Sequence, residues 1–198
     1  MLDWLKNINK DHPDFWKDYI SKFDKKSMRF VVLSTETSGM NVEKDVILSI
    51  GSFAVIDNSI VIGDSYEAVV LQYRFLHDNG RPDDILLDNK TSKIAESEAI
   101  ISLIEFIGNA VLVGHHIDFD VEMINAALER LDCGKLKNEA LDVDIMHRKL
   151  LDINDKQFSL DQLYATYNIP LSERNSAAED AYKTALLFLK LKSRLGIK

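Results

Sequence analysis

One continuous apolar run, from Arg29 to Gly39, limits what this chain can fold into more than any other stretch. It reads RFVVLSTETSG and follows two lysines, Lys25 and Lys26. A β-branched run of this kind, closed by a glycine, suits a strand buried on both faces better than a helix. The carboxylate of Glu36 is therefore expected at a strand end, where binding and catalytic groups are often found.

Length and composition predict a soluble globular protein. The 198 residues fit one domain, or one domain with an appendage, and a hydrophobic content of 46% is ample for a core. The apolar runs are far shorter than the roughly 20 residues of a membrane span, and the N-terminus does not resemble a signal peptide. We therefore expect a cytoplasmic protein with no membrane partner. The single cysteine, Cys133, rules out an internal disulfide framework, and we expect a structural or surface thiol.

The net charge argues against a protein that coats nucleic acid by bulk electrostatics. The formal charge is -8 and the pI is near 5.1, whereas such proteins are usually basic. A local nucleic-acid site remains possible because bound cations can neutralise both cleft carboxylates and substrate phosphates.

The first 26 residues are predicted to form a helical appendage, residues 1–26, ahead of a main domain at residues 27–198. Aromatic and aliphatic residues recur at a spacing of three to four around Pro13, as in an amphipathic helix. They are Trp4, Phe15, Trp16, Tyr19, Ile20 and Phe23. Two interpretations stay open: this face packs on the protein's own core, or it docks another protein.

Three strands are expected before any long core helix. Residues 46–56 form an apolar run, Asp57-Asn58 is a tight turn, and the apolar pattern resumes at once over 59–62. This arrangement predicts a β-hairpin, and residues 65–73 are expected to form a further strand.

The middle of the chain alternates loops, helices and one short strand. Residues 75–91 are polar and are predicted to form a mobile loop, whereas Ser97–Asn109 has a helical apolar pattern with a serine cap. The apolar residues 111–114 predict a short strand. The polar cluster 115–120 follows directly, and a helix is expected over 121–131.

The C-terminal third repeats the strand-then-helix order. Residues 140–144 are expected to form a strand and 145–151 a helix, and Ser159 begins a short helix. The longest helix is expected over 176–195, with Asp180 in its first turns. We find no glycine-rich phosphate loop in the sequence.

Three of these segments resemble the motifs of the DEDD-type 3'-5' exonucleases. The segments are VLSTETSG with the following DVILSIG, then VGHHIDFD, and finally NSAAEDA. The last motif resembles the histidine-containing branch exemplified by the epsilon proofreading subunit of bacterial DNA polymerase III. The likeness covers roughly residues 28 to 195, and the order and spacing of the motifs make it specific.

The resemblance implies a fold, a cofactor and a reaction. The fold is an α/β, ribonuclease H-like exonuclease fold, a five-stranded mixed sheet of three antiparallel strands and then two parallel ones, flanked by helices. The reaction is phosphodiester hydrolysis by two cations about 3.5–4 Å apart. Carboxylate ligands suit Mg²⁺ or Mn²⁺, and a histidine takes the proton from the attacking water.

Matched position by position, two of the five catalytic positions of the family carry other residues here. The four carboxylates of the family fall on Ser34, Glu36, Asp120 and Asp180, and the proton acceptor falls on Asn175. Glu36, Asp180 and Asp120 are therefore the expected metal ligands. A serine hydroxyl is a neutral, weak ligand, and an asparagine amide accepts no proton at neutral pH.

The resemblance also implies substrate contacts. Thr37 matches a position beside the terminal nucleotide, Met40 could line the base pocket, and His116 is a further candidate for substrate binding. The expected partner is a nucleic-acid 3' end or a nucleoside monophosphate.

Two other clusters could bind a metal or could be structural. The first is His115, His116 and Asp118, which could hold a transition metal or could cap and pack the following helix. The second is Asp142, Asp144 and His147, for which a structural role is expected.

Three functions follow from these observations. The chain is predicted to bind or act on nucleic-acid 3' ends with weak or absent hydrolysis. The alternatives are an active metal-dependent exonuclease with compensating residues, and a protein-interaction subunit built on a nuclease fold.

Overall fold

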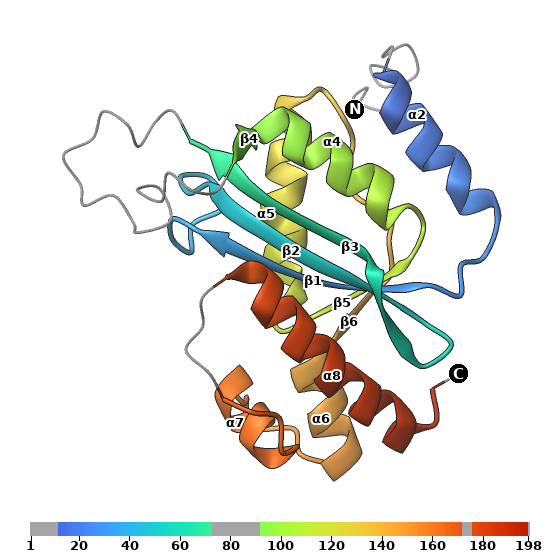
Figure 1. The fold of residues 1–198 in the computed structure, drawn as a ribbon, viewed down its shortest axis with the longest axis vertical. Coiled ribbons are helices and arrows are strands. Elements are labelled where there is room, and N and C mark those ends of the chain that lie inside the picture. The colour runs from blue at the N-terminus through green and yellow to red at the C-terminus, as the bar shows by residue number, and fades with distance from the viewer. Residues whose placement is uncertain (1–11, 73–91, 172–175, 198) are drawn as a thin grey trace, which may run out of the picture.

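A mixed sheet of six strands, covered by helices on both faces, forms the centre of the molecule (Figure 1). The computed structural model describes residues 12–72, 92–171 and 176–197. The strand order is β4-β3-β2-β1-β5-β6. The strands are β1 (Phe30–Thr37), β2 (Ile47–Ile56), β3 (Ser59–Leu71), β4 (Lys93–Ala95), β5 (Val111–Gly114) and β6 (Ala140–Asp142).

The pairing confirms the predicted mixed sheet and adds one strand. β1, β2 and β3 are antiparallel neighbours, and β5 and β6 continue the sheet parallel to β1. The predicted count of five strands is wrong, because β4 pairs parallel with Val69–Leu71 of β3. A strand of three residues is too short to show a period of two in the sequence.

The helices divide into two layers, one on each face of the sheet (Figure 1). α2, α4 and α5 pack in one hydrophobic core, and α6, α7 and α8 in the other. Their bounds are α2 (Asp14–Ser21), α4 (Glu96–Ile107), α5 (Ile117–Arg130), α6 (Val143–Leu151), α7 (Leu160–Thr166) and α8 (Ala177–Leu195), with a 3-10 turn, η1, at Lys22–Asp24. None of the helices in these ranges is long and apolar enough to cross a lipid bilayer.

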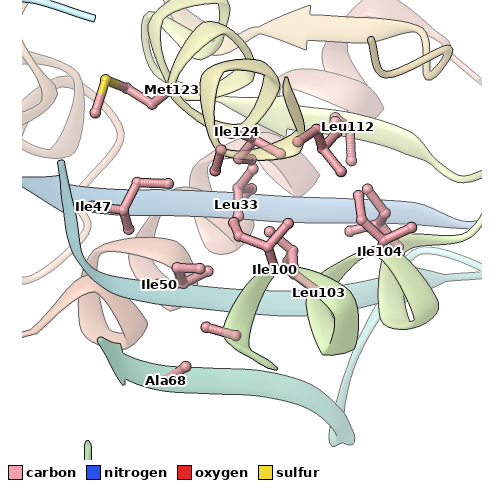
Figure 2. Close-up of a cluster of buried hydrophobic side chains, with 14 of the residues drawn as sticks. Leu33, Ile47, Ile50, Ala68, Ile100, Leu103, Ile104, Leu112, Met123 and Ile124 are labelled. Atoms are coloured by element: carbon pink, nitrogen blue, oxygen red, sulfur yellow. The ribbon is translucent and has the colours of Figure 1, made fainter. Parts of the chain in front are cut away.

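The strand β1 is buried on both faces, as its sequence predicts. Leu33 lies in the core formed with α4 and α5, where Figure 2 shows it among Ile100, Leu112 and Ile124. Val32, one residue earlier, points to the opposite face and lies in the core formed with α8.

The predicted hairpin is present, with an irregular second strand. Asp57 and Asn58 have φ values of 48° and 63°, which fit a tight two-residue turn. Residues 59–71 form one strand rather than two, but its register with β2 jumps from Ser65 to Val61. The residues between them, 62–64, account for the break that the sequence suggested.

Two helix starts differ from the prediction for local reasons. α4 begins at Glu96, and its N-cap position is Ala95 with no side-chain cap, so the predicted serine cap is wrong. α6 begins at Val143 because Asp142 accepts hydrogen bonds from Asp144 N (2.7 Å) and Ile145 N (3.3 Å). This cap ends β6 at Asp142, two residues before the predicted end.

The aromatic face of α2 packs against the rest of the chain. Trp16 and Tyr19 are 3% and 1% exposed and belong to the same core as α4. The Tyr19 hydroxyl donates to Asn138 Oδ1 (2.6 Å) and accepts from Lys137 N (2.8 Å). Trp4 and the predicted loop 75–91 lie outside the described residues. The domain boundary at residue 26 stays a prediction.

Candidate active site

The site is built at the carboxyl end of β1, where successive side chains point to opposite helix layers. Ser34 and Glu36 share a face with Val32, which packs toward α8. Thr35 shares the opposite face with Leu33, toward α5. The two layers therefore reach the strand end from opposite sides.

The start of α8 lies directly over β2 beside Ser34. Gly51 is the partner of Ser34 in the β1–β2 register. A Cβ atom at Gly51 would stand only 2.2 Å from the backbone nitrogen of Ala178, so the glycine permits this approach. Ser176 caps the helix by accepting from Glu179 N (3.2 Å), and Asp180 lies in the first turn.

Asp120 is bound to the backbone between Ser34 and Glu36. Its Oδ1 accepts hydrogen bonds from Thr35 N (2.9 Å) and Thr35 Oγ1 (2.6 Å). The residue lies in the first turn of α5 and is 8% exposed. Burial raises the pKa of Asp120 to about 7, against the lowering effect of the Thr35 hydrogen bonds. The carboxyl group is therefore partly protonated at neutral pH.

Glu36 is held from the other face. Its Oε2 accepts a short hydrogen bond from the hydroxyl of Ser49, its partner across the β1–β2 ladder. Ser49 is 5% exposed, whereas Glu36 is half-buried at the strand end. One carboxylate oxygen of Glu36 is thus engaged by the protein itself.

The carboxylate of Asp45 stabilises the turn after β1. Asp45 Oδ2 accepts from Asn41 N (2.7 Å), and a Cβ at Gly39 would stand 2.5 Å from the same oxygen. The hydroxyl of Thr37 donates to Gly39 O (2.8 Å), so this candidate substrate contact is used by the turn. Met40 is 79% exposed at the tip of the turn.

The two histidines at the start of α5 differ in their surroundings. His115 Nε2 lies 2.8 Å from Phe158 O, and burial lowers the pKa of His115 below its usual range. His116 is exposed, takes a left-handed conformation (φ 53°) at the N-cap position and makes no side-chain cap. His115 therefore contacts the segment before α7, and the predicted cap of α5 by a histidine is absent. A substrate contact by His116 stays a prediction.

The second acidic cluster is structural, as expected. Asp142 caps α6, and Asp144 accepts from Arg148 Nε (3.0 Å) and Phe158 N (3.0 Å). His147 Nδ1 lies 2.9 Å from the Tyr167 hydroxyl in a buried contact.

The carboxylates of Asp120 and Glu36 in the candidate site are each engaged by side chains of the protein. In the ranges that the structure describes, no group of three or more His, Cys, Asp or Glu side chains is placed to hold a metal ion. Asp120 is bound through Thr35 and Glu36 through Ser49, on opposite faces of β1. The predicted ligand set of Glu36, Asp120 and Asp180 therefore stays a prediction. Asn175 lies outside the described residues.

Thr35, Ser49 and Gly51 are site residues that sequence reasoning missed. A faint signal exists, because small residues at 49 and 51 interrupt an apolar strand on one face. The roles of Ser49 and Gly51 depend on the pairing of β1 with β2, and the role of Thr35 depends on the placement of α5.

The chain matches the family model described as Exonuclease over residues 31–188. It is 31% identical over 176 residues to a DNA polymerase III PolC-type protein of Caldanaerobacter subterraneus, covering 85% of this chain and 12% of that protein. A PolC-type protein of Latilactobacillus sakei is 29% identical over 173 residues, covering 83% of this chain and 11% of the relative. The chain thus spans only 11–12% of the length of these two relatives.

Other similar proteins are closer to this chain in length. The DNA polymerase III subunit epsilon of Aquifex aeolicus is 24% identical over 174 residues, covering 85% of this chain and 83% of that subunit. Exonuclease X in complex with 5' overhanging duplex DNA superimposes with a TM-score of 0.58 at 19% identity, covering 85% of this chain and 94% of that one. E. coli Exonuclease I in complex with a dT13 oligonucleotide gives 0.68 at 16% identity, covering 86% and 42%. The fold, the order of the motifs and the match over residues 31–188 together place this chain in the Exonuclease family.

Proposed function

We propose that this protein binds the 3' end of a nucleic-acid strand at the carboxyl end of β1 and hydrolyses it weakly or not at all. One observation carries the proposal: the acids around residues 34–36 are engaged by hydroxyls of the chain and form no group of three ligands in the described ranges. Membership of the Exonuclease family supports the substrate class.

The chemistry of the replaced residues supports weak hydrolysis. Ser34 offers a neutral hydroxyl where the resemblance expects a carboxylate, and Asn175 offers an amide where it expects a proton acceptor. Loss of a general base alone typically costs about 10²–10⁴ in rate.

The polar strand end supports binding. Glu36 and Asp180 are partly exposed, and Met40, in the turn that follows β1, is exposed. The structural neighbours include an exonuclease bound to duplex DNA and another bound to an oligonucleotide.

The test compares the protein with its Ser34→Asp/Asn175→His variant on 5'-labelled single-stranded DNA and RNA, with Mg²⁺ or Mn²⁺. We expect a ladder of shortened products from the variant at a rate at least about 10²-fold above that of the unmodified protein. A second variant, which adds Glu36→Ala to these two substitutions, controls for contaminating nucleases and should lose the gain in rate. Robust digestion by the unmodified protein, abolished by Glu36→Ala, would establish the active-nuclease alternative.

Binding is measured separately, because a protein without hydrolysis can still recognise an end. Fluorescence anisotropy with a labelled oligonucleotide should show binding that a linear competitor with a free 3' end displaces and a circular one does not. Equal competition by both would show nucleic-acid binding without recognition of an end and would overturn the proposed 3'-end site. No binding of either would leave the protein-interaction alternative.

A further inference from the structure

A hollow of about 540 Å³ lies beside α2, away from the candidate active site, between this helix and the segment that follows α5. We call it the α2 groove. Its described lining residues are His12, Trp16, Lys17, Ile20, Ser21, Gly134, Lys135 and Lys137.

The floor of the α2 groove is apolar. Trp16 and Ile20 face it from successive turns of α2. Gly134 lets the opposite wall come close, since a Cβ there would stand 3.3 Å from Trp16 Cζ2. Trp16 is 3% exposed, so the groove offers the indole edge and no open ring face. Such a floor suits an inserted apolar side chain better than a stacked base.

The rim of the α2 groove is basic in an acidic protein. Lys17, Lys135 and Lys137 surround it together with His12, and none of its described lining residues is acidic. The three lysines are exposed, and the pair of Lys17 with Asp14 (3.5 Å) lies at the surface. The net charge of the chain is -8, but the lysines of this rim carry positive charge. The rim should therefore attract carboxylates.

We propose that the α2 groove binds a short acidic segment of a partner protein, which inserts one large apolar side chain between Trp16 and Ile20 while its carboxylates pair with the lysines of the rim. Charge complementarity selects this occupant, because both the floor and the rim are matched by a segment that combines one bulky apolar residue with several acids.

A neighbouring hollow predicts the orientation of the bound segment in the α2 groove. It has a volume of about 380 Å³, shares Gly134 and Lys135 with the α2 groove, and is also lined by Glu122 and Glu129. Carboxylates of the bound segment would be repelled there. The acidic part is therefore expected over Lys17 and Lys137, at the far end from α5.

The test uses the full chain with Trp4→Phe, which leaves Trp16 as the sole tryptophan. The probe is a synthetic peptide in which one phenylalanine follows a single run of aspartates. We expect a saturable change in Trp16 fluorescence. Affinity should fall about tenfold in Lys135→Glu/Lys137→Glu, because two rim charges are reversed. The control Lys149→Glu/Lys190→Glu makes the same change in net charge on α6 and α8, in the other helix layer, and should stay within about twofold.

Matched peptides separate the contribution of the carboxylates from that of the apolar side chain. Replacing the aspartates by asparagines, or the phenylalanine by serine, should each weaken binding. No saturable change up to about 1 mM peptide, or equal loss in both lysine pairs, would overturn the proposal. So would binding that appears only in Leu2→Ser/Leu5→Ser, which would make residues 1–11 the occupant. An equal fluorescence change with a single-stranded oligonucleotide, lost in the same rim variant, would identify a nucleic-acid site instead.

Discussion

At the scale of single residues, the end of β1 is governed by the alternation of side chains along a strand. Thr35 engages Asp120 from the α5 layer, and Glu36 engages Ser49 on the face covered by α8. The adjacent residues Thr35 and Glu36 therefore lead to two carboxyl groups on opposite faces of the strand. The hydroxyls of Thr35 and Ser49 thus orient the two carboxyl groups.

The raised pKa of Asp120 predicts a pH dependence of stability. The folded state holds this proton up to about pH 7, whereas the unfolded chain releases it near pH 4. The folded state therefore binds more protons in this window, and its stability falls as the pH rises through it. Relative to Asp120→Asn, the unmodified protein should lose up to about 4 kcal/mol of unfolding free energy between these limits.

Urea denaturation from about pH 4.5 to pH 7.5 measures the effect. Asparagine keeps an acceptor oxygen for the Thr35 hydrogen bonds and does not titrate, which makes it the matched control. Parallel stability curves for the two proteins would show that Asp120 titrates normally.

A second residue-scale prediction concerns Ser52, which is fully buried on β2. Its hydroxyl has no hydrogen-bond partner among the described residues. Burial of an unsatisfied hydroxyl costs about 1–3 kcal/mol, so Ser52→Ala should stabilise the protein by about 1 kcal/mol. Thermal unfolding of this variant and of Ser49→Ala provides the comparison. Ser49→Ala removes the bond to Glu36 and should not stabilise.

At the scale of elements, the contact of α8 with β2 depends on the absence of a side chain at Gly51. Gly51→Ala should force the start of α8 away from the sheet and cost about 2 kcal/mol of stability. It should also weaken binding at the strand end, because Asp180 lies in the first turn of α8. Chemical denaturation and the anisotropy assay measure the two effects.

Gly63→Ala is the matched control on β3. No atom lies within 4 Å of a Cβ built at Gly63, so the unfolding free energy should change by less than about 0.5 kcal/mol. Equal losses in both variants would mean that backbone flexibility, and not the helix contact, sets the cost.

Elements with long, regular patterns could be predicted from the sequence. Short elements, and those that depend on tertiary contacts, could not. The run at β1 and the turn at Asp57-Asn58 carry local signals, and both are present. β4 and the uncapped start of α4 depend on tertiary pairing, which overrides local preference.

The candidate site, too, could be predicted from the sequence only in part. The motifs indicated Glu36 and Asp120 as site residues. The hydroxyls that engage them come from Thr35 and Ser49, and these contacts become visible only once register and helix placement are known.

At the scale of the whole molecule, one sheet is shared by two cores. α2 contributes Trp16 and Tyr19 to the core that also holds Leu33 and Ile104. A helix bound in this way should unfold together with the sheet, even though it precedes the matched family region at residue 31.

Urea unfolding of the Trp4→Phe chain tests this cooperativity. Trp16 fluorescence reports on α2, far-UV circular dichroism reports on the whole chain, and the two midpoints should coincide. An earlier fluorescence transition would mean that residues 1–26 behave as a separate appendage.

The interrupted register of β3 has a consequence for aggregation. Among the described residues, β4 pairs only with Val69–Leu71, so the outer edge of β3 over 59–68 has no strand beside it. Unpaired edges recruit strands from other molecules. Residues 62–64 break the regular edge, and Arg29 binds Asp64 through two hydrogen bonds (2.9 and 3.1 Å) at the break. We therefore expect the irregular edge and this ion pair to hinder strand pairing between copies of the chain.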